Sequence, residues 1–207
     1  MSKFERELFA QAYKISLKNA EQWIKDAKLL MEHSSFGHAN ALLRFASEEI
    51  GKALISWYVS EELFPSNSKP VRDVFRNHVT KNQVILGILI GLQWAESRRK
   101  GQIEVTREPT DKEIEKAWNL FKDMTFGMEK QRQKGIYVDL DLKNKKIASP
   151  ETITEEEVKV ILQGTEVLFR YVSGIPERFS DQDKERFREF FKSLPKEVWK
   201  TGQIPIE

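Results

Sequence analysis

Side chains suited to proton transfer and anion binding gather in one short stretch of the chain, residues 72–81. His78 carries an imidazole, a group that titrates near neutrality and can therefore accept or donate a proton at physiological pH. Arg72, Arg76 and Lys81 supply positive charge, which binds a phosphate and stabilises negative charge that develops on it. The stretch therefore holds the residue types that phosphate chemistry without a metal ion requires.

The carboxylate of Glu49 is a second candidate, because it falls on the apolar face of a predicted helix. Burying an ionised carboxylate alone is costly or raises its pKa, so such a group needs a hydrogen-bond donor or a cation. We expect Glu49 to lie within hydrogen-bonding reach of His78 or Lys81 on a neighbouring helix. The apolar face is defined by residues spaced three or four apart: Leu42, Ala46, Glu49, Ala53 and Trp57.

Other residues of the same predicted helix fit packing and surface roles. Arg44, Glu48 and Lys52 lie four residues apart on a neighbouring flank, where a ladder of ion pairs explains them. Gly51 weakens a helix by about 1 kcal/mol relative to alanine, which suggests that another part of the chain approaches closely at that point. These interpretations leave Glu49 as the acid that needs a buried partner.

Apolar periodicity and helix-breaking residues predict an all-α bundle. Ser34 or Ser35 is the expected N-cap of the second helix, and Pro70 suits the first turn of the third. The apolar run 84–94 is too short to cross a bilayer and predicts a central core helix. The other helices of this part are expected at about 4–31, 35–62 and 110–130.

The C-terminal part carries strong local signals. Thr154 and Glu157 form a capping box, and Gly174 and Pro176 are expected to end the helix that the box begins. A short charged helix after it is expected to cap the bundle. Before the capping box, apolar and polar residues alternate, which predicts a short extended segment. The extended segment and the two helices cover about 136–141, 154–173 and 181–194.

The relative placement of Arg72 and His78 depends on whether one helix carries both. On a continuous helix the two residues would be roughly 120° apart around the axis and would not share a face. Either Arg72 lies in an irregular segment that leads into the helix, or the two side chains reach one phosphate from different sides. Arg76 is the competing phosphate ligand. His78 and Lys81 do share a face, which makes them the better-defined local pair.

Composition and charge bound the class of protein. The 207 residues are 40% apolar and 11% aromatic, enough to bury a core as one domain or one domain with an appendage. A net charge of +2 favours neither the presence nor the absence of a nucleic-acid partner. The sequence has no cysteine, no Glu-x-x-His pair and no glycine-rich phosphate loop, so we expect no metal and no cofactor. Residues 1–7 lack the apolar core of a signal peptide, so we expect a cytoplasmic protein without membrane contact.

Three further groups of residues have simpler explanations than a functional site. His33 and His38 lie in a predicted polar turn, and the basic residues 98–100 complement a helix dipole. A small nucleic-acid clamp is the alternative role for residues 98–100. Asp139 and Asp141 have the oxygen atoms to bind a cation, but no third oxygen ligand accompanies them at a useful spacing.

Several motifs, in order over residues from about 21 to 171, resemble the AbiV abortive-infection proteins, an all-helical branch of the HEPN superfamily. HEPN proteins typically carry an arginine, four to six residues and a histidine, and Arg72 and His78 fit with five residues between them. The motifs that carry the resemblance are Leu29-Leu30, Ser34-Ser35-Phe36-Gly37-His38-Ala39, Ala46-Ser47-Glu48-Glu49-Ile50-Gly51-Lys52-Ala53, His78-Val79-Thr80-Lys81, Lys134-Gly135-Ile136-Tyr137-Val138-Asp139 and Ser149-Pro150.

The resemblance implies a HEPN-like helical bundle that acts in phage defence as a metal-independent endoribonuclease or toxin. Cleavage of RNA without a metal needs a base for the 2′-hydroxyl and cations for the charge at the scissile phosphate. By this resemblance His78 is the general base or acid. Arg72, with Arg76 as its substitute, is the phosphate ligand.

The other residues of the implied site have supporting roles. Lys81 adds charge stabilisation, and Glu49 orients His78 or Lys81. Asp73 places an anion beside Arg72, which weakens the electrostatics of phosphate binding. The residues expected to contact RNA in addition are Arg76, Asn77 and Lys52.

The resemblance also implies an assembly. HEPN clefts are commonly built at a two-fold interface, so we expect a homodimer with the groove between the second and third helices near the axis. A phage trigger or a neutralising antitoxin would be its protein partner. The bundle is assigned to residues 1–173, and residues 174–207, beyond the resemblance, to a helical appendage packed on it.

A non-catalytic helical module that binds protein or RNA is the alternative function. In that case Glu49, His78 and Lys81 form a satisfied buried polar network that fixes helix register. The sequence alone does not distinguish a ribonuclease from a module that binds protein or RNA without cleavage.

Overall fold

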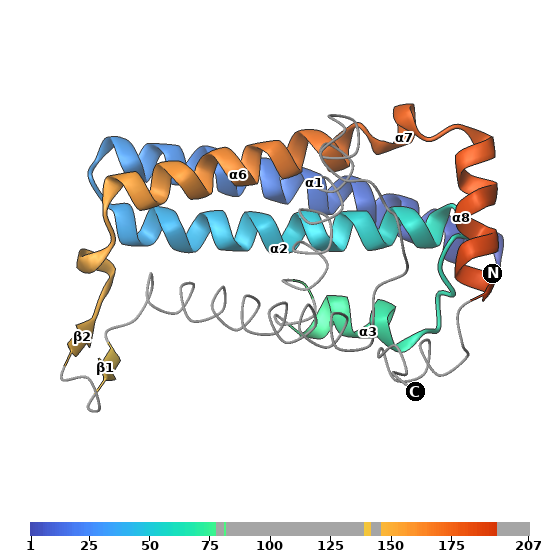
Figure 1. Cartoon of the computed structure of the whole chain (residues 1–207), viewed down its shortest axis with the longest axis horizontal. Helices are drawn as coiled ribbons and strands as arrows, with labels where there is room; N and C mark the ends of the chain where they lie inside the picture. Colours follow the sequence, from blue (N-terminus) through green and yellow to red (C-terminus); the bar gives the residue numbers. More distant parts are fainter. Residues whose placement is uncertain (78–80, 82–138, 142–145, 194–207) are drawn as a thin grey trace, which may run out of the picture.

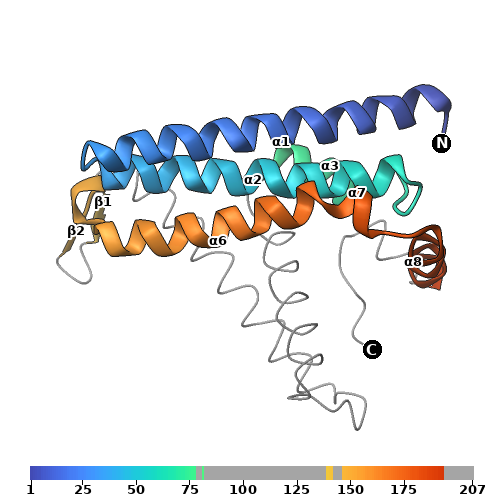
Figure 2. The same ribbon diagram turned by 90° about the horizontal axis from the view of Figure 1, so that it is seen from above.

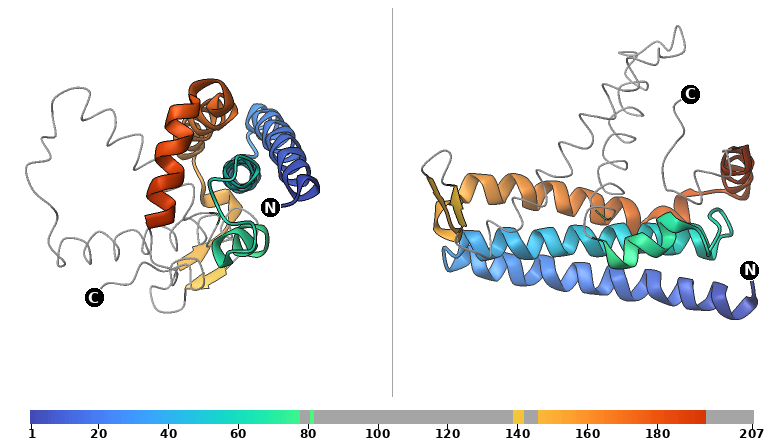
Figure 3. Two further views of the ribbon diagram at one scale, coloured as in Figure 1. Left: turned by 90° about the vertical axis from the view of Figure 1, so that its right-hand side faces the viewer. Right: turned by 90° about the horizontal axis from the view of Figure 1, so that it is seen from below.

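A computed structural model of the chain describes residues 1–77, 81, 139–141 and 146–193, and these residues form a helical bundle (Figure 1). Its three long helices are α1 (Lys3–Glu32), α2 (Phe36–Ser60) and α6 (Glu155–Ser173). Helix α2 packs against both of the others, and in the end-on view it lies at the centre of the bundle (Figure 3). The prediction of an all-α, HEPN-like bundle with extra C-terminal helices is confirmed.

The helix boundaries follow local capping signals. The predicted capping box of Thr154 and Glu157 is present at the start of α6, and Gly174 is the C-cap. Ser35 occupies the N-cap position of α2, as expected, but its side chain caps no backbone group and its hydroxyl instead lies 3.0 Å from Nδ1 of His38. Ser2 and Glu5 form a second capping box at the start of α1, which the sequence reading did not include.

Shorter elements complete the described chain. Two strands, β1 (Asp139–Asp141) and β2 (Lys146–Ala148), pair antiparallel, so the expected extended segment is confirmed for its last three residues. The helices expected within 84–94 and 110–130, and residues 136–138, lie outside the described residues. A single turn, α7, follows α6 directly, because Pro176 is compatible with the first turn of a helix. The remaining elements are α3 (Lys69–Arg76), η1 (Pro150–Thr152), α7 (Ile175–Arg178) and α8 (Asp181–Ser193).

Helix α2 supplies more of the core than any other described element, because it is buried on nearly all sides rather than along one stripe. Its alanines allow the long helices to approach closely, and its larger residues fill the space between them. Gly51 is buried, in line with the expected close packing. The buried core residues that α2 contributes include Leu43, Ala46, Ile50, Ala53, Leu54 and Trp57.

Helix α8 packs across the end of the bundle where α2 finishes (Figure 2). The rings of Phe179 and Trp57 meet edge to face at 5.2 Å, and Phe187 stacks on Tyr58 at 6.4 Å. Burial raises the pKa of Tyr58 to about 12. Nζ of Lys184 also lies 2.9 Å from the carboxylate of Glu61. The division of the chain into a bundle and an appendage stays a prediction.

In the described part of the chain, no helix combines the length and the apolar character needed to cross a membrane.

Two helical glycines provide a matched test of this packing. A Cβ added to Gly37 would overlap both the side chain and the carbonyl oxygen of Pro150, whereas one added to Gly164 would meet nothing within 4 Å. Gly37→Ala should therefore lower the free energy of unfolding by about 1–3 kcal/mol. Gly164→Ala should raise it by up to about 1 kcal/mol, because alanine is the better helix former. Urea denaturation measures both; equal effects would contradict the close approach of η1 to α2.

Candidate functional site

Helix α3 positions two of the predicted site residues on its solvent side. Pro70 lies in its first turn, as predicted. Val71 and Val74 are buried against Ile55 and Val59 of α2. The opposite face consequently exposes Arg72 and Arg76, one turn apart. The structure thus brings both candidate phosphate ligands together on one accessible surface. Figure 1 shows helix α3 below α2.

Arg72 and the adjacent Asp73 have different interaction partners. Asp73 forms an ion pair with Lys69, one turn earlier on α3. Arg72 instead donates from Nη1 to the carbonyl oxygen of Asn67, at 2.6 Å. The expectation that Asp73 weakens the electrostatics at Arg72 is therefore corrected, because a lysine already compensates the charge of Asp73. Arg76 forms no hydrogen bond or ion pair with any described residue.

The helical conformation is interrupted between Arg72 and Lys81. Helix α3 ends at Arg76, and Asn77 is extended, with φ −118° and ψ 119°. Lys81 is helical again and donates its backbone N–H to the carbonyl oxygen of Asn77 at 3.2 Å. One continuous helix through Arg72 and Lys81 is therefore ruled out, and Arg72 lies on a separate short helix. His78 lies outside the described residues, directly after this break.

A buried ion pair joins the segment after the break to α2. Nζ of Lys81 lies 3.3 Å from Oε2 of Glu48, and the two side chains are only 7% and 6% exposed. The prediction that Glu49 is the buried acid that meets Lys81 is wrong, since Glu48 holds that place. Helix α2 is buried almost all round, so an apolar stripe along it could not tell which of two adjacent glutamates faces Lys81.

Glu49 and Lys52 form a second pair on α2, in which both side chains are partly exposed. Neither Glu48 nor Lys52 therefore belongs to the expected ladder with Arg44. Lys52 was predicted to contact RNA, but its charge is compensated within the helix. A contact between Glu49 and His78 lies outside the described residues.

Arg44 lines a pocket of about 440 Å³ between α2 and the start of α6. Its Nε is buried without a hydrogen-bond partner among the described residues, and burial lowers the pKa of the guanidinium. Glu156 and Glu157 line the same pocket, so it offers little net attraction to an anion. The sequence reading missed this pocket, because spacing alone placed Arg44 in a surface ladder.

The described residues contain no cluster of three or more histidine, aspartate or glutamate side chains that could hold a metal ion. His33 and His38 are exposed, and His38 is engaged by Ser35. The side chains of Asp139 and Asp141 lie outside the described part, so a cation site there stays untested.

The described helices form an all-α bundle, and the matching family model makes this a protein of the HEPN class. The chain belongs to the AbiV family, whose profile matches residues 8–170. Its function is accordingly of the abortive-infection, HEPN type. No curated protein matches the chain. No solved structure matches it either. The family match ends before α7 and α8.

The ion pair between Lys81 and Glu48 gives a prediction for stability. Glu48→Gln leaves the ammonium of Lys81 buried without its ion pair, and Lys81→Met removes a buried cation from Glu48, so each should lower the free energy of unfolding by about 3–5 kcal/mol. The double variant should lose clearly less than the sum of the two. Glu49→Gln, the matched control, should cost less than about 1 kcal/mol. Additive single effects in urea denaturation would show that the two charges do not interact.

Proposed function

We propose that the protein is a metal-independent endoribonuclease that acts as an abortive-infection toxin in the cytoplasm. The observation that carries the proposal is the exposed pair Arg72 and Arg76 on α3, directly before His78, in a chain of the AbiV family. Cleavage of RNA without a metal requires cations at the phosphate and a base at the 2′-hydroxyl, and these residues provide both types.

In the proposed reaction Arg72 binds the scissile phosphate and His78 removes the proton of the 2′-hydroxyl. The 2′-oxygen then attacks phosphorus, and the bond to the 5′-oxygen breaks as that oxygen takes up a proton. Arg72 suits its role because Asp73 is paired elsewhere and because the bond to Asn67 holds the guanidinium in place. Arg76 and the exposed Asn77 extend the contact to the RNA.

Lys81 contributes to this site by position rather than by contact with the phosphate. Its side chain is nearly inaccessible and paired with Glu48, so it anchors the segment that follows Asn77 onto α2. His78 lies three residues before this anchor in the sequence. The orienting role that was assigned to Glu49 therefore passes to Glu48 for Lys81, and it remains a proposal for His78.

A non-catalytic binding module is the second candidate function. The observation that favours it is the same buried pair, since it joins Lys81 to α2 through two nearly inaccessible side chains, as a structural polar network would. A phage protein or an antitoxin would then dock on the exposed face of α3. The two candidates differ in what the loss of His78 does.

His78→Ala should abolish RNA cleavage, measured on gels with a chelator present, while the melting temperature stays within a few degrees of wild type. The reason is that proton transfer requires the imidazole, whereas the ion pair that joins Lys81 to α2 is made by the side chains of Lys81 and Glu48. His33→Ala, at an exposed position after α1, is the matched control and should remain active. A destabilised but active His78→Ala variant would end the catalytic proposal and leave the binding module.

We also propose a homodimer whose two-fold axis lies near the groove between α2 and α3. Phe75 supports this placement, because its ring is 40% exposed on α3 beside the two arginines. A second apolar surface lies on the outer face of α1, where four large side chains fall within about 60° around the helix. These side chains, at 51–74% exposure, are Phe4, Leu8, Ile15 and Leu29.

The dimer is tested by sedimentation at micromolar concentration. Phe75→Glu should convert the dimer to monomers, because it places a charge in the proposed interface, and Leu8→Glu on α1 should leave it intact. If Leu8→Glu dissociates the dimer and Phe75→Glu does not, the interface is on α1 and no composite site forms at α3. A monomeric wild type would overturn the dimer itself.

A further inference from the structure

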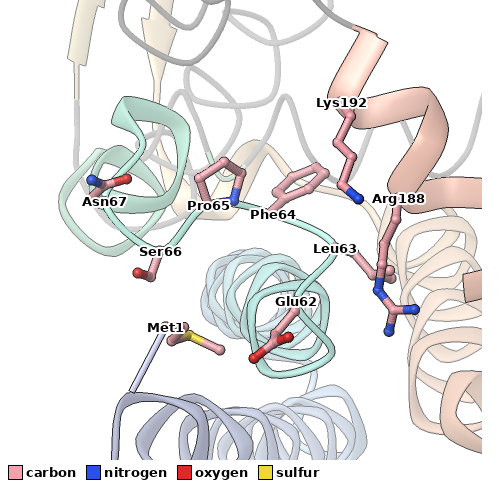
Figure 4. A pocket seen from close by; sticks show the side chains of 9 residues that line it. All are labelled: Met1, Glu62, Leu63, Phe64, Pro65, Ser66, Asn67, Arg188 and Lys192. Carbon is pink, nitrogen blue, oxygen red and sulfur yellow. The ribbon is translucent and has the colours of Figure 1, made fainter. Parts of the chain in front are cut away.

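A pocket of about 480 Å³ opens at the end of the bundle, between the segment after α2 and helix α8. Arg188 and Lys192 project from α8 toward the loop that carries Phe64 and Pro65 (Figure 4). Helix α8 lies beyond the residues that match the AbiV family, so family membership assigns this pocket no role. The full lining is Met1, Glu62, Leu63, Phe64, Pro65, Ser66, Asn67, Arg188 and Lys192.

Lys192 gives this pocket a positive charge, and Arg188, whose own charge is paired with Glu185, adds N–H donors. Lys192 is exposed and has no ion-pair partner among the described residues. Arg188 is held in place by Glu185, at 2.7 Å, and by the carbonyl oxygen of Glu61, at 3.1 Å. The carboxylate of Glu62 is paired with Arg6, so it does not cancel the cations of α8. An anionic ligand is therefore favoured.

The pocket is linked to the candidate phosphate ligand Arg72 through Asn67. Asn67 lines it, and the carbonyl oxygen of Asn67 accepts the hydrogen bond from Arg72. One loop thus separates the guanidinium of Arg72 from the cations of α8. A polyanion bound at Arg72 has a second cationic surface next to it.

The lining also offers an apolar surface for a base. Phe64 is half-buried, with its ring 5.1 Å from that of Tyr58, and Pro65 beside it is exposed. Tyr58 in turn stacks on Phe187 of α8, which fixes this wall. Aromatic surfaces next to cations are the combination by which proteins hold single-stranded nucleic acid.

We propose that this pocket binds a nucleotide of single-stranded RNA next to the one whose phosphate lies at Arg72, with its phosphate at Lys192 and Arg188 and its base against Phe64 and Pro65. The inference rests on the proposed ribonuclease function and adds α8 to the RNA-binding surface. The pocket then selects single strands, because the faces of a base within a duplex are covered by its stacked neighbours and cannot pack on Phe64.

The test uses the full chain and a single-stranded RNA with a 2′-deoxy position that blocks cleavage. Lys192→Gln should raise the Kd severalfold and lower the slope of log affinity against log salt by about 0.7, the loss of one phosphate contact. Lys159→Gln removes an exposed lysine of α6, at the other end of the bundle, and should change neither quantity. With cleavable RNA, Lys192→Gln should raise KM and leave kcat unchanged.

The possible outcomes distinguish a failure of the pocket proposal from a failure of the proposed ribonuclease function. If Lys192→Gln and Lys159→Gln weaken binding equally, the attraction is diffuse and the pocket is not a site. If wild type cleaves RNA and Lys192→Gln has the same KM, the pocket is overturned while the ribonuclease stands. If wild type neither binds nor cleaves RNA, both proposals fail together.

Discussion

The buried ion pair between Glu48 and Lys81 is the interaction on which the candidate site depends. Two charges withdrawn from water are stable only while each has the other and enough hydrogen bonds, so the pair tolerates little displacement. Glu48 belongs to α2, the central helix of the bundle, and Lys81 follows the extended Asn77 by four residues. Lys81, three residues after His78 in the sequence, is therefore held to α2 by a contact that a shift in register would break.

The burial of α2 explains why α3 carries the exposed chemistry. Since α2 is covered on nearly all sides, its acidic residues form ion pairs within the protein, as Glu48 with Lys81 and Glu49 with Lys52 show. Helix α3 is short and buries only one face, through Val71 and Val74. Its arginines consequently remain available to a ligand, and the Lys69–Asp73 pair keeps the one nearby acid from competing with them.

The C-terminal helices give this member of the AbiV family a surface beyond the matched region. Helix α8 is attached by aromatic contacts to Trp57 and Tyr58 and by the bonds of Lys184 and Arg188 to Glu61. These contacts place its cations beside the loop that Arg72 holds. The position of α8 next to this loop is thus set by packing between elements more than 100 residues apart in the sequence.

The sequence by itself determined the features that depend on near neighbours: the all-α class, the capping box at Thr154, the end of α6 at Gly174 and the start of α3 at Pro70. Each is decided by hydrogen bonds or backbone angles within a few residues, which a sequence displays directly. Only the tertiary structure decided that Glu48 rather than Glu49 meets Lys81, that the helix ends before Asn77, and that α8 shares a pocket with the loop to which Arg72 is hydrogen-bonded. These depend on which surfaces meet across the bundle, and two adjacent glutamates on a helix buried all round carry no local signal of that choice.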